Sequence, residues 1–197
     1  MLPMSALLDR RAAVAALLRD PADLIVVTGL GTASYDAFAA GDRDGNYYLW
    51  GAMGSAALVG LGIAQAQPNR FIVVITGDGE QLMGLGGLAT IAIAKPQNLS
   101  IVILDNQHFG ETGMQPSHTA HGLNLAEVAI ACGFSDARMV TDMNSVEALQ
   151  SELRQSAPGP RLFVLKVRAE ELPRCLPPRD AIYLKRRLRT FLGLTSM

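Results

Sequence analysis

The chain has 197 residues, which suits one domain with a sizeable hydrophobic core, and its formal net charge of −1 gives no electrostatic reason to expect a nucleic acid partner. Charged residues at Asp9, Arg10 and Arg11 fall where a signal peptide would need its apolar core, and no apolar run is long enough to cross a membrane. The two cysteines, Cys132 and Cys175, lack a metal-binding spacing, so we expect reduced thiols in a cytoplasmic protein.

The N-terminal part of the chain alternates predicted helices with a predicted strand. Ser5 can cap a first helix through about Arg19, which Asp20 and Pro21 end. An apolar strand at 24–27 is followed by a glycine-bearing turn at 28–34. A polar loop at 41–46, an aromatic segment at 47–50 and a helix of small residues at about 53–67 come next.

The central part of the chain reads as strand, turn, helix and strand. An all-apolar run at 71–75 precedes the turn, and a second apolar run lies at 101–104. The stretch between them predicts a helix from Leu82 to Ala94, ended by Lys95 and Pro96. Because right-handed crossovers join parallel strands, both strand ends should lie on the same edge of one sheet.

Polar residues follow both of these strands. Gly77-Asp78-Gly79 comes after the first strand, and Asp105-Asn106 ends the second. Asp78 supplies an anionic oxygen and Asn106 a neutral one, beside glycines whose backbone amides can approach a phosphate closely. The pattern therefore predicts a site for a magnesium diphosphate at this edge.

The C-terminal part continues the alternation. The expected elements are a helix near 125–131, a short strand at 138–140, a helix at 145–156, a last strand at 161–167, and a proline-rich link with a basic helix within 172–197. Near-continuous apolar strands interleaved with helices favour an α/β fold: one three-layer domain over 1–197, with a mostly parallel sheet covered by helices on both faces.

The central unit resembles the cofactor motif of thiamine diphosphate enzymes, which runs Gly-Asp-Gly, helix, strand, Asn-Asn. The resemblance implies thiamine diphosphate and Mg²⁺ as cofactors, with Asp78, Asn106 and the main-chain carbonyl of His108 as protein ligands of the metal. Asp105 replaces the first Asn of the motif, which leaves the implied ligand Asn106 in place.

Two N-terminal segments extend this resemblance. Gly51-Ala52-Met53-Gly54 is similar to the family's Gly-x-Leu/Met-Gly turn, in which an apolar residue supports the bent cofactor; ordinary core packing by Met53 is the alternative. Ser34 falls where relatives place a hydroxyl on the diphosphate, although a helix N-cap would look the same.

The loop at 106–119 is similar to that of phosphonopyruvate and sulfopyruvate decarboxylases, and residues 79–90 match the same group. His118 and His121 are candidates for a proton donor or for holding an anionic substrate tail, and Glu111 for lining the same pocket; solvated loop side chains are the alternative for all three. With Met53 these are the candidate catalytic residues. The implied cofactor-binding residues are Ser34, Gly51, Met53, Gly77, Asp78, Gly79, Glu80, Asn106, His108, Phe109 and Gly110.

The resemblance covers only the diphosphate-binding half of such enzymes. It implies a partner pyrimidine-binding (alpha) subunit that donates the activating Glu, in a hetero-oligomer built on a dimer. The implied reaction converts a small 2-oxo acid to CO₂ and an aldehyde. The sequence leaves open which 2-oxo acid is the substrate and whether the product is joined to a second carbonyl compound.

Other interpretations stay open. Residues 29–34 imitate a dinucleotide-binding turn, but the third glycine is missing. The loop at 106–115 also resembles that of the thiamine-binding chain of 2-oxoacid:ferredoxin oxidoreductases, for which coenzyme A dependence would be diagnostic. A carboligating synthase and a non-catalytic scaffold or regulatory subunit are further alternatives.

Overall fold

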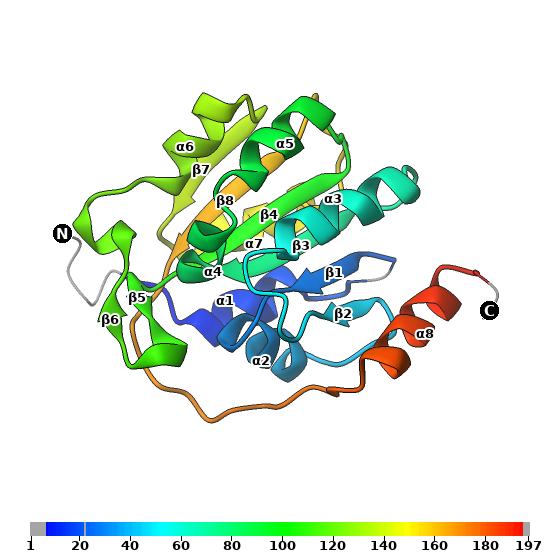
Figure 1. Cartoon of the computed structure of the whole chain (residues 1–197), viewed down its shortest axis with the longest axis horizontal. Helices are drawn as coiled ribbons and strands as arrows, with labels where there is room; N and C mark the ends of the chain where they lie inside the picture. The colour runs from blue at the N-terminus through cyan, green and yellow to red at the C-terminus, as the bar shows by residue number, and fades with distance from the viewer. Residues whose placement is uncertain (1–6, 22, 195–197) are drawn as a thin grey trace.

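Six parallel strands form one sheet in the computed structural model, which describes residues 7–21 and 23–194 (Figure 1). The strand order is β2-β1-β3-β4-β8-β7. The strands are β1 Ile25–Thr28, β2 Asn46–Tyr48, β3 Ile72–Gly77, β4 Leu99–Asp105, β7 Asp136–Val140 and β8 Arg161–Lys166. Since β2 and β3 lie on opposite sides of β1, the chain changes direction there, and such a point is where α/β sheets bind ligands beyond their carboxyl ends.

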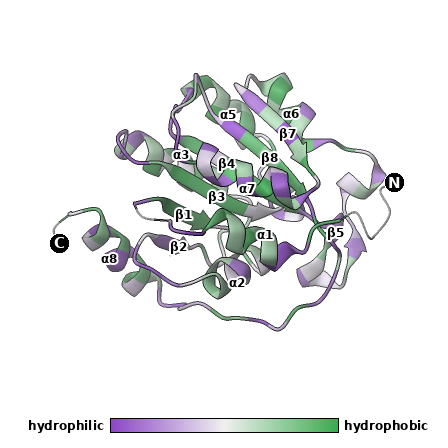
Figure 2. Ribbon diagram, turned by 180° about the vertical axis from the view of Figure 1, so that it is seen from behind, coloured by the Kyte–Doolittle hydropathy of each residue, from purple (hydrophilic) through white to green (hydrophobic). Residues whose placement is uncertain are grey.

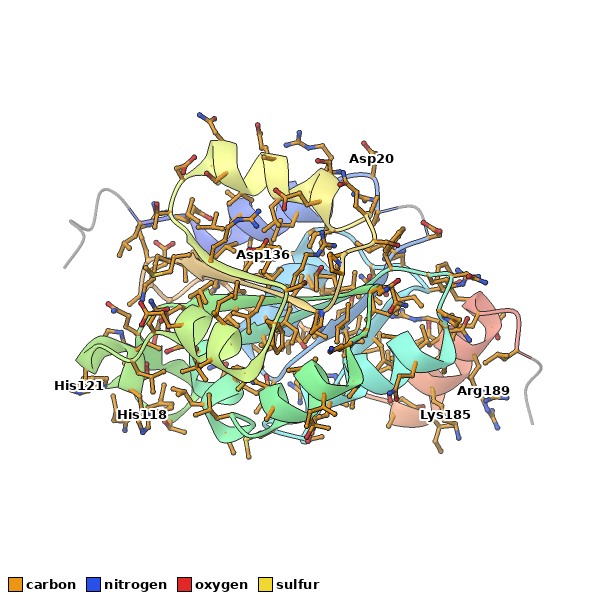
Figure 3. The ribbon with its side chains drawn as sticks, turned by 90° about the horizontal axis from the view of Figure 1, so that it is seen from above. Asp20, His118, His121, Asp136, Lys185 and Arg189 are labelled. Atoms are coloured by element: carbon orange, nitrogen blue, oxygen red, sulfur yellow. The ribbon has the colours of Figure 1, made fainter. Side chains whose placement is uncertain are left out.

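Helices cover both faces of the sheet, and Figure 3 shows the resulting three layers. One face packs against α1 Arg10–Leu17, α2 Thr32–Ala39 and α7 Met143–Glu152. The other packs against α3 Ala56–Ala66, α5 Gly87–Ala94 and α6 Leu125–Cys132. The short helix α4 Asp78–Met83 follows β3, and α8 Ala181–Phe191 packs beside the edge strand β2. The predicted α/β class with helices on both faces is confirmed.

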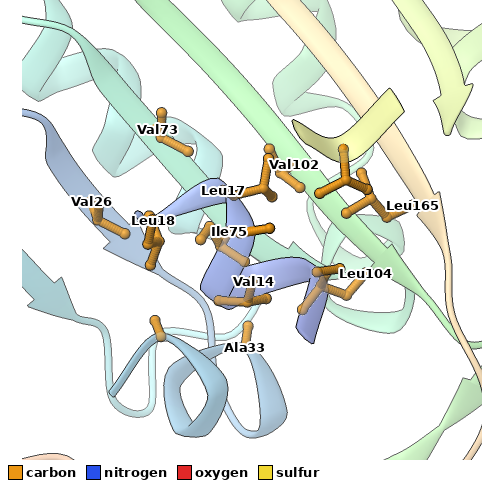
Figure 4. Packing of buried hydrophobic residues seen from close by; sticks show 14 of the residues in the cluster. Val14, Leu17, Leu18, Val26, Ala33, Val73, Ile75, Val102, Leu104 and Leu165 are labelled. Carbon is orange, nitrogen blue, oxygen red and sulfur yellow. The ribbon is translucent and has the colours of Figure 1, made fainter. Parts of the chain in front are cut away.

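The two core clusters divide the strand residues by alternation. Val73 and Ile75 of β3 face α1 and α2, as Figure 4 shows, whereas Ile72 and Val74 belong to the opposite cluster. All four side chains are fully buried, so β3 is apolar on both faces, as Figure 2 shows for the central strands. This continuous burial is the reason that the strand reads as one apolar run.

The predicted helix from Leu82 to Ala94 is wrong, because the structure has two helices, α4 and α5, in this region. The chain turns at Gly84, where a Cβ atom would lie 2.0 Å from the carbonyl oxygen of Gly54. Helix α4 also begins directly at Asp78, so the expected turn at 77–79 is the start of a helix.

The first helix starts later than predicted. The expected cap, Ser5, lies outside the described residues, and α1 begins at Arg10 with Asp9 as its N-cap, accepting a hydrogen bond from the amide of Ala12 at 2.8 Å. Before it, Leu8 forms a parallel bridge with Val167 at the end of β8. This bridge places the start of α1 at the carboxyl edge of the sheet.

The loop after β4 contains more regular structure than the sequence indicates. It includes the hairpin of β5 His108–Phe109 and β6 Gln115–Pro116, with 3-10 turns at Gly110–Thr112 and His118–His121. The C-terminal link then runs past α2 to α8, held by a 2.9 Å hydrogen bond from the indole of Trp50 to the carbonyl of Pro178 (Figure 1). Across the described residues, none of the helices combines the length and the apolarity that crossing a membrane requires.

Candidate functional site

Asp78 stands at the carboxyl end of β3, where the chain enters α4. The register of β3 and β4 pairs Gly77 with Leu104. The next residue after each of these, Asp78 and Asp105, therefore lies at the same edge of the sheet. Asp78 is 2% exposed, and its Oδ2 accepts hydrogen bonds from the hydroxyls of Ser117 and Thr119, at 2.5 and 3.2 Å. The two hydroxyls thus orient a buried carboxylate at the sheet edge.

Asp105 organises the turn that follows β4. Its carboxylate accepts hydrogen bonds from the amide of Gln107 at 3.0 Å and the hydroxyl of Thr119 at 2.8 Å, and pairs with Lys166 at 2.5 Å. Gln107 has a φ of +63°, which is uncommon for a residue with a side chain. The strained residue reverses the chain, so that Asn106 and His108 lie side by side, linked by a 3.0 Å hydrogen bond from the His108 amide to the Asn106 Oδ1.

A cavity opens between the ends of β3 and β4 and the start of α2. Most of the residues predicted to bind the cofactor line it. Its lining comprises Arg10, Leu30, Thr32, Met53, Gly77, Asp78, Gly79, Glu80, Met83, Leu104, Asn106, His108, Phe109, Gly110, Glu111 and Thr112. The phenyl ring of Phe109 lies against Gly79, where a Cβ atom would come within 2.7 Å of the ring, so a larger residue there would displace the ring.

The residues at this edge suit a hard divalent cation. Burial raises the pKa of Asp78 to about 6. The hydrogen bonds from Ser117 and Thr119 lower this pKa, and the negative charge of Asp105 raises it further. A bound cation would stabilise the ionised form. No group of three His, Cys, Asp or Glu side chains suited to a metal occurs among the described residues, whereas one carboxylate, one amide and one carbonyl suit Mg²⁺, which keeps several non-protein oxygen ligands.

Glu80 connects the two sides of the cavity. Its Oε2 accepts hydrogen bonds from the Leu30 amide and the Thr76 hydroxyl, both at 2.9 Å. The same oxygen would lie 1.6 Å from a Cβ atom on Gly29. Burial raises the pKa of Glu80, opposed by these two hydrogen bonds. The residue predicted to bind the cofactor thus also holds the turn after β1 against β3.

Met53 lies at the mouth of the cavity with 53% of its surface exposed. The turn that carries it is held by glycines, since Gly51 and Gly54 have φ values of +78° and +81°. Gly54 packs directly against the end of α4, beside Met83. Gly51 itself does not line the cavity.

Three other predicted residues lie outside the cavity lining. The hydroxyl of Ser34 donates to the carbonyl of Gly29 at 2.7 Å and contacts the Thr28 hydroxyl at 2.6 Å, so it holds the turn after β1. His118 and His121 border a separate surface hollow, at the outer end of the molecule (Figure 3). Their predicted catalytic role, like that of Glu111, which does line the cavity, stays a prediction.

Sequence reasoning missed three residues of this region. Ser117 and Thr119 hold Asp78, and both stand in the loop motif that carried the resemblance, so their hydroxyls could have been noticed. Arg10 lines the cavity from the start of α1, more than 60 residues before Asp78. No motif surrounds it, and only the placement of α1 brings it here.

Comparison with known families and sequences agrees with this geometry. The family model described as "Thiamine pyrophosphate enzyme, C-terminal TPP binding domain" matches residues 28–167. The sulfopyruvate decarboxylase subunit beta of Methanocaldococcus jannaschii is 37% identical over 132 residues, covering 67% of this chain and 68% of that one. The phosphonopyruvate decarboxylase of Streptomyces viridochromogenes is 38% identical over 190 residues, covering 93% of this chain but 46% of that one, so the chain spans about half of that relative.

Solved structures with low sequence identity share the fold. A putative thiamin diphosphate-dependent enzyme from Mycobacterium smegmatis aligns with a TM-score of 0.71 at 21% identity, covering 83% of this chain and 32% of that one. Benzoylformate decarboxylase from Polynucleobacter necessarius aligns with a TM-score of 0.71 at 19% identity, covering 88% and 36%. The resemblance drawn from the motifs is confirmed: the chain belongs to the thiamine pyrophosphate enzyme family and contains its C-terminal cofactor-binding domain.

Proposed function

We propose that this chain is the diphosphate-binding subunit of a thiamine diphosphate- and Mg²⁺-dependent decarboxylase. Its substrate is a 2-oxo acid similar to sulfopyruvate or phosphonopyruvate, and its products are CO₂ and an aldehyde. The observation that carries the proposal is the meeting of Asp78, Asn106 and His108 on one cavity at the carboxyl ends of β3 and β4. The substrate class is supported by relatives named sulfopyruvate decarboxylase subunit beta and phosphonopyruvate decarboxylase.

Mg²⁺ would be held by the carboxylate of Asp78, the side-chain oxygen of Asn106 and the main-chain carbonyl of His108. When bound, thiamine diphosphate supplies the electron sink that lets a 2-oxo acid lose CO₂. The chain's own contribution is to hold the diphosphate end and to orient the proposed ligand Asp78 through Ser117 and Thr119. Met53 would support the rest of the cofactor at the cavity mouth.

The activating Glu would come from a partner pyrimidine-binding subunit, within a hetero-oligomer built on a dimer. Two apolar side chains at the mouth of the cavity support this arrangement, because Met53 and Met83 are 53% and 62% exposed. A partner that covers them would remove apolar surface from water and exclude water from the site. The subunit name of the archaeal relative is in keeping with this division.

A mixing experiment tests the proposal. The purified chain with thiamine diphosphate and Mg²⁺ should release no aldehyde from sulfopyruvate, phosphonopyruvate or pyruvate, and addition of the co-purified partner subunit should start the release. Decarboxylation by the chain alone would contradict the partner requirement. Failure of the complex to bind thiamine diphosphate in a calorimetric titration would contradict the proposed function as a whole.

A further inference from the structure

Arg10 is a buried cation on the wall of the cofactor cavity. It is 3% exposed and opens α1, the helix positioned by the bridge between Leu8 and Val167. Its Nε donates to a carboxylate oxygen of Asp36 on α2, which is fully buried. Within the described part of the chain, no hydrogen-bonding partner is found for its two terminal nitrogens, and the residue lines the cavity together with Thr32 and Asn106.

The carboxylate of Asp36 is shared between Arg10 and a second arginine. Arg11 donates from its Nε to the other oxygen of Asp36 at 3.0 Å, so two guanidinium groups share one carboxylate. Arg11 is directed elsewhere, since its Nη2 donates to the carbonyl of Pro173 at 2.7 Å. A buried charge without a full set of partners is costly, and an anion beside Arg10 would remove that cost.

The start of α2 faces the same space. Gly31 precedes the helix with a φ of +75°, and no side chain caps the helix. The first amides of an uncapped helix favour an anion. In the structure the carboxylate of Glu111 lies against Gly31, where a Cβ atom would come within 2.4 Å of its oxygen. Glu111 is an exposed loop side chain, so a phosphate could replace it without disturbing the core.

The charges around the cavity also single out Arg10. Among the described residues that line it, Asp78, Glu80 and Glu111 are acidic and Arg10 alone is a permanent cation. Mg²⁺ at Asp78 and Asn106 cannot by itself balance a diphosphate and the acidic side chains. An arginine can bind a phosphate through two parallel hydrogen bonds.

We infer that Arg10, held in position by Asp36, binds the terminal phosphate of the diphosphate in the cavity that Asp78 and Asn106 also line. The inference rests on the proposed function, since it assigns a further binding residue to the same site. The terminal phosphate would lie between Arg10, the start of α2 and Asn106, which also border a second hollow beside the cavity. The site therefore selects for a diphosphate over a monophosphate.

The test compares thiamine diphosphate with thiamine monophosphate, each titrated calorimetrically with Mg²⁺ into the full-length protein, assembled with any partner that co-purifies. Arg10→Gln should raise the dissociation constant for the diphosphate about tenfold or more, as expected for loss of a charged hydrogen bond, and that for the monophosphate less than about twofold. Arg168→Gln is the control, because Arg168 is an arginine that pairs with Asp9 at the start of the same helix and lines neither hollow. It should leave the ratio of the two constants unchanged.

Arg10→Lys keeps a charge beside Asp36 and serves if the glutamine variant does not fold. It should lower the preference for the diphosphate about threefold or more, because an ammonium group cannot form the paired hydrogen bonds. An unchanged ratio of constants in the Arg10 variants, or an equal change in Arg168→Gln, would overturn the inference alone. No binding of thiamine diphosphate to the unsubstituted protein would overturn the proposed function with it.

Discussion

Two buried arginines, Arg10 and Arg187, lie in different regions and are paired to different extents. Arg187 on α8 donates to Asp42 at 2.7 Å and to the carbonyl of Asn46 at 2.8 Å. Its guanidinium also lies over the ring of Tyr48. Among the residues that the structure describes, Arg10 on α1 is hydrogen-bonded only through its Nε, to Asp36, and it lines the cofactor cavity.

The difference separates a structural cation from a binding cation. Both terminal nitrogens of Arg187 donate hydrogen bonds within the chain, and these bonds attach α8 to the edge strand β2. The terminal nitrogens of Arg10, by our inference, bind an anion that comes from outside the chain. We therefore expect substitutions near α8 to lower the free energy of unfolding, and substitutions near the cavity to lower cofactor affinity.

The largest expected effect is on stability, from Arg187→Met. Removing the guanidinium breaks a partly exposed ion pair with Asp42 and leaves the carbonyl of Asn46 without this buried donor, which should together lower the free energy of unfolding by about 3 kcal/mol. Urea denaturation followed by circular dichroism measures the change. Lys185→Met is the matched control, since Lys185 is an exposed cation on the same helix (Figure 3). If Arg187→Met lowered cofactor affinity and left stability unchanged, Arg187 would not be the structural cation described above.

Asp78→Ala should lower cofactor affinity and leave the fold intact, the reverse of the effect expected for Arg187→Met. Loss of the carboxylate that we propose binds Mg²⁺ should raise the dissociation constant of Mg²⁺-thiamine diphosphate about 100-fold or more, while the circular dichroism spectrum stays that of the folded protein. Calorimetric titration measures the affinity. Asp142→Ala is a control with the same change at a surface N-cap, and it should lower the melting temperature slightly without altering affinity. Unchanged affinity in Asp78→Ala would refute the role of Asp78.

Gly84→Ala should affect both properties to a moderate extent. The new methyl group would lie 2.0 Å from the carbonyl oxygen of Gly54, so the turn that carries Met53 must shift, at a cost of about 2 kcal/mol. The melting temperature and the cofactor affinity should fall together. Gly86→Ala is the control, because no atom lies within 4 Å of a Cβ there, and its melting temperature should stay the same or rise. A Gly84→Ala protein as stable as the unsubstituted one would contradict the close contact.

The smallest expected effect concerns His121. Because it borders a separate hollow, His121→Ala should change the affinity for thiamine diphosphate less than about twofold. The rate of aldehyde release by the complex with the partner subunit then tests its predicted catalytic role. A tenfold loss of rate at unchanged cofactor affinity would show that the histidine acts on the substrate, and an unchanged rate would remove it from the candidates.

Several features of the site could be read from the sequence because they depend on neighbours in the chain. The apolar runs before Asp78 and Asn106 define two parallel strands, and the crossover between them brings both ends to one edge. The division of the intervening segment into α4 and α5 could not be read in this way. Gly84, Gly86 and Gly87 weaken a helix at the break, and Gly84 lies against Gly54, which is distant in the chain.

Local pattern by itself determined the α/β class, the parallel strands and the identity of the metal-ligand candidates, since hydrophobic periodicity and strand-end motifs are properties of short segments. Only the tertiary structure decided that Ser117 and Thr119 orient Asp78, that His118 and His121 lie outside the cavity, and that Arg10 lies on its wall. The physical reason is that burial and charge pairing depend on groups brought together by packing. A lone arginine at the start of a helix carries no sign in the sequence of the carboxylate it will meet.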